Sequence, residues 1–167
     1  FRILRALRFA ATYGFSIEEQ TAAAIHKDAW MLKRIAAERI NGELCKMLLG
    51  DGILNVLLNF SDVIATIIPE MEPCIGFEQN NKYHQYTVYE HIAHAVANYK
   101  GTDVSVKVAL LLHDIGKPQC YTEDENGGHF HGHGYQAVIL QNKFWIDCGS
   151  IIRQSRKFLN SCFITTL

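Results

Sequence analysis

Hydrophobic positions recur at helical spacing along most of the chain. In residues 2–13 the apolar side chains share one helical face, which predicts an amphipathic helix that stops at Gly14. Ser16 and Glu19 have the spacing of a capping box, so the next helix is predicted to begin at Ser16 and run to about Asp28. Further helices are predicted over residues 37–49, 53–60, 88–98, 104–115 and 135–146.

The clearest interruption of this helical pattern lies at residues 68–73, whose sequence is IPEMEP. It predicts a boundary between a first lobe of residues 1–68 and a second lobe of residues 69–167. Residues 124–134 are rich in glycine and histidine and are predicted to form a loop. No segment requires a strand, so the predicted fold class is all-α.

Composition adds limits on location and partners. The chain has 167 residues with a formal net charge of -1, so contact with nucleic acid would depend on local basic patches. Its five cysteines form no CxxC pair, which is typical of reduced thiols in a cytoplasmic protein. No apolar run reaches roughly 18 residues, so no membrane span is expected. Because Phe1 opens within a helical pattern, the chain is expected to be a fragment.

A His-Asp pair ends the most apolar of the predicted helices. A buried carboxylate at position 114 would face the negative end of the helix dipole, a conflict that a divalent cation resolves. We therefore predict that His113 and Asp114 are metal ligands, joined by His91 from an earlier helix and by His133 from the glycine-rich loop. His133 could equally be a solvated loop histidine. A mixed His and carboxylate set does not choose among Mg, Mn, Ni and Zn.

Other polar residues near this pair have more than one interpretation. Lys117 is a candidate to meet a phosphate group as a point charge. His94 shares a helical face with His91 but is expected to be a surface or core residue, and His84 is expected to pack near the site. Further along the chain, Asp147 is the only acidic residue after His133.

Three arginines, Arg2, Arg5 and Arg8, recur every third position in the first predicted helix. The planar guanidinium group suits phosphates and base edges, which would make this stripe a nucleotide-binding surface. The alternative is an ordinary solvated helix face.

Several ordered segments resemble bacterial CCA-adding tRNA nucleotidyltransferases and related poly(A) polymerases that carry an HD domain. They read FRILRALRFAATYGFSIEEQT, AERINGELCKMLLG, IIPEMEPCIGFEQNNKYHQYTVYEHI and ALLLHDIGKP, and the resemblance covers roughly residues 1–140. It implies that Arg2, Arg5 and Arg8 contact the incoming CTP or ATP and that the body helices bind tRNA. It also implies that the catalytic head of the intact enzyme is absent here.

Three functions follow from these observations. The first is a part of a tRNA nucleotidyltransferase that adds CCA, with tRNA and nucleotides as partners. The second is a metal-dependent phosphohydrolase that acts on nucleotides or 2′,3′-cyclic phosphodiesters, with His113, Asp114 and Lys117 as catalytic residues. The third is an RNA-binding helical module with a vestigial metal site. HD hydrolases usually complete their ligand set with a later Asp, so the second lobe is expected to be incomplete at its C-terminal end.

Overall fold

The computed structural model of the chain describes residues 1–79, 85–124 and 127–148. Those residues are mainly helical, as predicted, and they also contain a small antiparallel sheet. The α-helices are α1 (Arg2–Tyr13), α2 (Glu19–Asp28), α3 (Ala37–Leu48), α4 (Ile53–Asn59), α5 (Ser61–Ile67), α6 (Val88–Asn98), α7 (Val104–Leu112) and α8 (His133–Cys148). The 3₁₀ helices are η1 (Ala29–Arg34), η2 (Pro69–Cys74) and η3 (Lys117–Cys120), and the strands are β1 (Tyr121–Asp124) and β2 (Gly127–Phe130).

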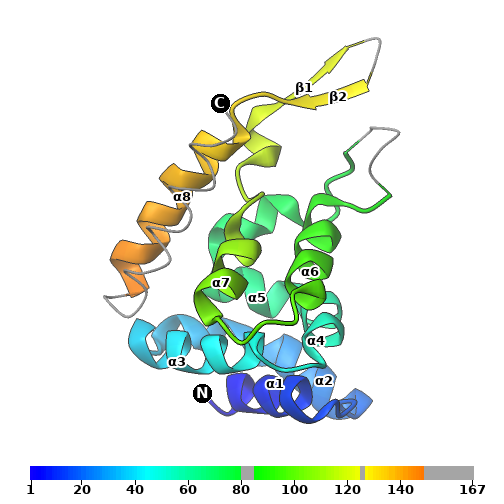
Figure 1. Cartoon of the computed structure of the whole chain (residues 1–167). Coiled ribbons are helices and arrows are strands. Elements are labelled where there is room, and N and C mark those ends of the chain that lie inside the picture. Colours follow the sequence, from blue (N-terminus) through cyan, green and yellow to red (C-terminus); the bar gives the residue numbers. More distant parts are fainter. Residues whose placement is uncertain (80–84, 125–126, 149–167) are drawn as a thin grey trace.

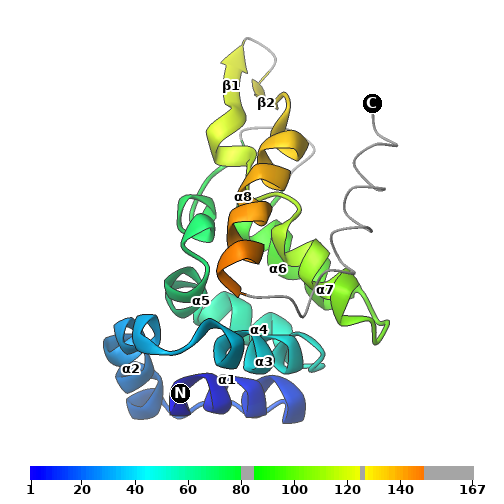
Figure 2. The ribbon, with the colours of Figure 1, turned by 90° about the vertical axis from the view of Figure 1, so that its left-hand side faces the viewer.

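The helices form two crossed groups. Helices α1 and α3 lie side by side across one end of the molecule, and α6 and α7 pack together above them (Figure 1). The β-hairpin projects at the opposite end, and α8 returns from it past η3 toward α3 (Figures 1 and 2). No helix in the described part of the chain is long and apolar enough to cross a membrane.

The first helices begin and end largely where the pattern predicts. Helix α1 ends at Gly14, whose φ of 70° is the left-handed conformation predicted for it. The predicted capping box at Ser16 is wrong, because Glu18 caps α2 instead. Its carboxylate accepts hydrogen bonds from the backbone N–H groups of Gln20 and Thr21, each at 2.9 Å. A negative charge at this position also interacts favourably with the helix dipole.

The turn between α3 and α4 holds the end of α1 by close backbone contact. The Gly52 N–H donates a hydrogen bond of 2.8 Å to the carbonyl oxygen of Ala11. A Cβ atom on Gly50 would lie only 2.5 Å from the Ala11 backbone. Glycine is therefore required at position 50 by the short distance between this turn and the backbone of α1.

The helix that carries His91 and the helix that precedes His113 and Asp114 are both capped at their N-terminal ends. Thr87 and Glu90 form a capping box at the start of α6, and Asp103 caps α7 by accepting from the Ser105 N–H at 2.8 Å. Helix α7 ends at Leu112, earlier than the predicted residue 115. As a result, His113 and Asp114 lie just beyond the helix rather than inside its last turn.

The hairpin is the main departure from the predicted fold. Residues 121–124 and 127–130 form paired strands where a loop was predicted over 124–134, and His133 is the first residue of α8 rather than a loop residue. The Tyr121 and Phe130 rings pack across the two strands at 5.4 Å, and Phe77 meets Tyr121 edge-on at 5.3 Å. Such cross-strand aromatic contacts stabilise a short hairpin that glycine content alone would not predict.

Buried apolar side chains from both predicted lobes form one continuous cluster, which extends from α1 to α7 and to Ala137 of α8. The division at residue 69 stays a prediction. Within the described residues the thiols of Cys45, Cys74 and Cys120 form no disulfide.

Candidate metal centre

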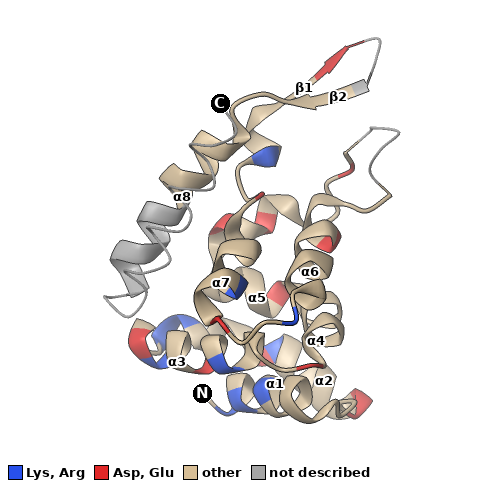
Figure 3. Cartoon of the chain, in the orientation of Figure 1, with Lys and Arg blue, Asp and Glu red and all other residues tan. Residues whose placement is uncertain are grey.

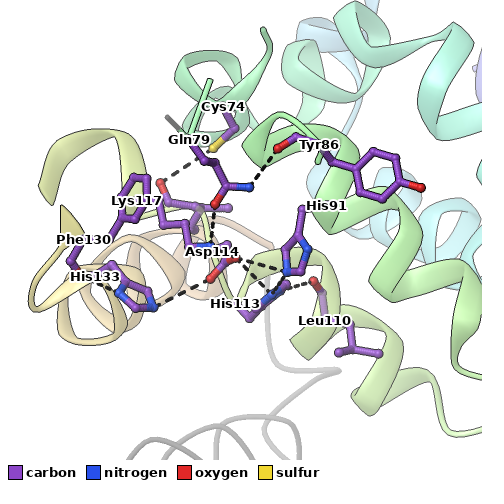
Figure 4. A network of polar contacts seen from close by, with 11 residues as sticks. Cys74, Gln79, Tyr86, His91, Leu110, His113, Asp114, Lys117, Phe130 and His133 are labelled. Atoms are coloured by element: carbon purple, nitrogen blue, oxygen red, sulfur yellow. Dashed lines mark hydrogen bonds and ion pairs between the residues drawn. The ribbon is translucent and has the colours of Figure 1, made fainter. Parts of the chain in front are cut away.

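Two chain segments bring three predicted ligands together (Figure 4). Helix α6 supplies His91, and the residues directly after α7 supply His113 and Asp114. The two Nε2 atoms lie 3.4 Å apart, and the Oδ2 atom of Asp114 lies 3.5 Å from His91 Nε2 and 3.2 Å from His113 Nε2. Among the described residues these three form a group whose ligand atoms all lie within 4.8 Å of one another.

Backbone carbonyls fix the orientation of two histidine rings. The Nδ1 atom of His113 lies 2.7 Å from the Leu110 carbonyl oxygen, and the Nδ1 atom of His133 lies 2.6 Å from the Phe130 carbonyl oxygen. In each case Nδ1–H donates to the carbonyl oxygen, which turns Nε2 toward Asp114. This hydrogen bonding on the far nitrogen is the usual arrangement of metal-binding histidines.

Asp114 is a buried carboxylate in a cationic environment. Burial acts to raise its pKa, but the hydrogen bond and charge of His113 and the ammonium group of Lys117 together hold the pKa well below its ordinary value. The Lys117 Nζ atom lies 2.8 Å from Oδ2 and also donates to Gln79 Oε1 at 2.9 Å. The carboxylate is therefore ionised and already paired with one cation.

These three ligand atoms fit a divalent metal ion. Given their separations, a point equidistant from all three lies roughly 2 Å from each, close to the zinc–ligand distances of about 2.0–2.2 Å. The two histidine side chains remain partly exposed above the buried carboxylate, which leaves room for water or substrate on that side.

The fourth predicted ligand, His133, is placed differently from the other three. His133 Nε2 lies 3.8 Å from Oδ1 of Asp114, on the opposite carboxylate oxygen from the other two histidines (Figure 4). It is brought near the cluster but does not join the group of three. The side chain of Asp147 lies outside the described residues, as does His84.

The remaining predicted residues lie apart from the cluster. Arg2, Arg5 and Arg8 lie on α1, which has no acidic residue, whereas the neighbouring α3 carries residues of both charges (Figure 3). Arg8 forms an ion pair of 3.1 Å with Glu43 on α3. His94 stacks on Tyr86 at 4.4 Å and contributes no ligand atom to the group of three.

Gln79 is a part of this site that sequence reasoning missed. Its side chain is buried and bridges Lys117 and the Tyr86 carbonyl oxygen, to which Nε2 donates at 2.9 Å. It thereby connects the loop before α6 to the residues after α7. A glutamine in a polar loop carries no signal of this role, because its position depends on the folded arrangement of both segments.

The described residues thus form a helical protein. A candidate divalent-metal centre lies directly after α7, and the helix that carries the three arginines, α1, lies apart from it. Residues 14–74 match the family model described as "Probable RNA and SrmB- binding site of polymerase A". The chain is 31% identical to the multifunctional CCA protein of Nitrosococcus oceani, covering 83% of this chain and 36% of that protein. It is 32% identical to the A-adding tRNA nucleotidyltransferase of Deinococcus radiodurans, covering 79% of this chain and 33% of that protein.

A third relative, the CC-adding tRNA nucleotidyltransferase of Thermus thermophilus, is 29% identical over 87% of this chain and 37% of its own length. The chain therefore belongs to the family of CCA-adding tRNA nucleotidyltransferases and poly(A) polymerases, as the sequence resemblance indicated. It spans about a third of the length of these curated relatives.

Proposed function

We propose that this chain is the RNA- and nucleotide-binding part of a tRNA nucleotidyltransferase whose whole form adds CCA to tRNA 3′ ends. The observation that carries this proposal is the family relationship along most of the chain, including the RNA-binding family model over residues 14–74. The basic surface of α1 supports it, because arginines supply the phosphate contacts that a chain with net charge -1 must concentrate locally.

The arginines of α1 divide into two kinds. Arg2 and Arg5 are exposed, whereas Arg8 is partly buried by its ion pair with Glu43 and by the Phe9 ring, over which its guanidinium lies at 4.4 Å. We expect Arg2 and Arg5 to contact phosphate groups of RNA or of CTP and ATP. Arg8 would instead stabilise the packing of α1 on α3 through its ion pair with Glu43.

The test is tRNA binding by the 167-residue chain at increasing salt. An Arg2→Gln/Arg5→Gln variant should bind more weakly and lower the slope of log affinity against log salt by roughly 1.4–1.8, the value for two lost phosphate contacts. Lys100→Gln is a control that removes a single positive charge elsewhere, since Lys100 lies beyond α6 and donates to the Ala97 carbonyl oxygen. Absence of tRNA binding by the unmodified chain at low salt would refute the proposal.

A second function, metal-dependent phosphohydrolysis of nucleotides or 2′,3′-cyclic phosphodiesters, is favoured by the convergence of His91, His113 and Asp114. A divalent ion held there would polarise a phosphoryl oxygen and lower the pKa of a bound water. The protein would supply the two imidazole ligands, the ionised carboxylate and a fixed ring orientation. A direct contact of Lys117 with phosphate stays a prediction, because its ammonium group is engaged by Asp114 and Gln79.

Metal content measured by mass spectrometry, beside hydrolysis of 2′,3′-cyclic AMP with added Mn²⁺, Ni²⁺ or Mg²⁺, tests this second function. About one equivalent of metal and measurable turnover are expected for the unmodified chain, and both should be lost in His91→Ala. Metal without turnover would limit the site to a structural role. Neither metal nor turnover would leave an RNA-binding helical module with a vestigial site.

A further inference from the structure

A pocket of about 300 Å³ opens between the C-terminal end of α1, α2 and α4, away from the metal cluster. This volume is at the lower end of the range for small-ligand sites. Its walls combine two aromatic rings and several aliphatic side chains, Ile17 among them, with an imidazole and two amides. The rings, the imidazole and the amides belong to Phe15, Phe60, His26, Asn55 and Asn59.

The polar groups of the pocket are held in defined positions. The Nδ1 atom of His26 lies 2.9 and 2.8 Å from the two carboxylate oxygens of Asp62, and the ring stacks on Phe60 at 5.0 Å with an interplanar angle of 15°. Asn59 Nδ2 donates to Asn55 Oδ1 at 2.6 Å. That bond leaves the Asn55 NH₂ group as a donor and the Asn59 carbonyl as an acceptor for a ligand. A donor beside an acceptor matches the hydrogen-bonding edge of a nucleobase.

A row of exposed aromatic side chains leads along α1 to this pocket. The rings of Phe9 and Tyr13 stack at 6.0 Å and those of Tyr13 and Phe15 at 5.5 Å, and Phe15 also lines the pocket. The three residues are 38%, 61% and 62% exposed. The guanidinium groups of Arg5 and Arg8 lie over the Phe9 ring at 5.9 and 4.4 Å, which places positive charge at the start of the row.

We propose that this pocket binds one unpaired base of single-stranded RNA, with neighbouring bases stacked on the aromatic row and their phosphates near Arg5. Single-strand sites combine aromatic stacking platforms with basic groups that follow the backbone, and this surface has both. Most of the lining residues fall within residues 14–74, the segment that matches the RNA-binding family model. The proposal rests on the proposed RNA-binding function and names the place where bases are held.

The probe is an eight-nucleotide oligoadenylate containing one 2-aminopurine, titrated into the 167-residue chain. Phe15→Ala should raise its Kd about tenfold and abolish the quenching of 2-aminopurine that stacking produces. Trp30→Ala is the matched control, because Trp30 is 50% exposed and carries Arg34 over its ring at 4.8 Å but does not line the pocket. We expect the Kd of Trp30→Ala for the oligoadenylate to change less than twofold. Circular dichroism checks that each variant keeps its helices.

An octamer of abasic ribose phosphates separates the contribution of base stacking to binding from that of the phosphate contacts. The unmodified chain and Phe15→Ala should bind it equally, since the loss in the variant concerns stacking alone. If Phe15→Ala binds the oligoadenylate as tightly as the unmodified chain while tRNA is still bound, the pocket proposal is overturned and the proposed function stands. If the unmodified chain binds neither tRNA nor oligoadenylate at low salt, both proposals are overturned.

Discussion

Replacing Asp114 by Asn should reveal how much of the candidate metal centre is also structural. The side chains of Asp114 and Lys117 are only 5% and 7% exposed, and their charged atoms lie 2.8 Å apart. Removing one partner of a buried ion pair leaves an uncompensated charge, which costs about 3–5 kcal/mol. Gln79 remains a hydrogen-bond acceptor for Lys117, so we expect a loss near the lower limit, about 3 kcal/mol.

The assay is urea unfolding of the metal-free protein, followed by circular dichroism. A second variant, Asp114→Asn with Lys117→Met, removes both charges and should recover most of the lost stability, to within about 1 kcal/mol of the unmodified protein. Calorimetric titration with Zn²⁺ or Mn²⁺ should show no binding by the double variant. Recovered stability with lost metal binding would separate the ion pair from the ligand role of Asp114.

Two results would refute this reasoning. An unfolding midpoint for Asp114→Asn equal to that of the unmodified protein would show that the pair contributes no net stability despite its burial. Metal binding retained by the stable double variant would show that Asp114 is not a ligand. The His91→Ala variant keeps the Asp114–Lys117 pair and should lose metal affinity with little change in stability, which makes it the matched control.

Other predictions concern the stability of the helical fold. Gly50→Ala should destabilise the protein by about 1–3 kcal/mol, because its Cβ would meet the α1 backbone at 2.5 Å, whereas Gly42→Ala within α3 meets nothing within 4 Å and should stabilise by about 0.5–1 kcal/mol. Urea midpoints of the two variants compare these effects directly, and similar shifts would contradict the close approach. Tyr89→Phe should cost about 1–2 kcal/mol in the same assay, because its hydroxyl donates at 2.9 Å to a buried backbone carbonyl of α4; an unchanged midpoint would show that this bond adds nothing. Backbone N–H groups lower the pKa of Glu18, so its capping stabilises α2 above roughly pH 4 and fades as pH falls through the lower folded value. The stability difference between the unmodified protein and Glu18→Ala should therefore shrink in acid, and a difference that grows would reverse the sign of this linkage.

The sequence predicted long amphipathic helices better than short elements. Helices α1, α3 and α6 begin and end within a residue of their predicted limits, because apolar spacing and glycine stops determine them locally. The segment η1 and helix α5 were not predicted, since each is short and continues a neighbouring apolar run. The hairpin depends on contacts among Tyr121, Phe130 and Phe77, which only the folded chain brings together.

The candidate site shows the same division. The adjacent pair His113 and Asp114 could be singled out from the sequence by its place at the end of an apolar helix. His91 was predicted as a ligand because it is a histidine in an earlier helix, and its Nε2 atom lies beside Nε2 of His113 and Oδ2 of Asp114. Neither the pairing of Lys117 with Asp114 nor the burial of Gln79 could be predicted, because both depend on how η3 and the loop before α6 meet.

The continuous apolar cluster has a consequence for how the molecule opens. Leu4 and Leu7 of α1 and Ile115, next to the metal ligands, are buried members of that cluster. The most protected amide hydrogens of a core exchange with solvent only when the whole unit opens. A cation that binds the folded but not the unfolded protein raises the free energy of unfolding of the whole unit. Occupancy at one end of the molecule should then slow deuterium uptake in α1 at the other, without any change in shape.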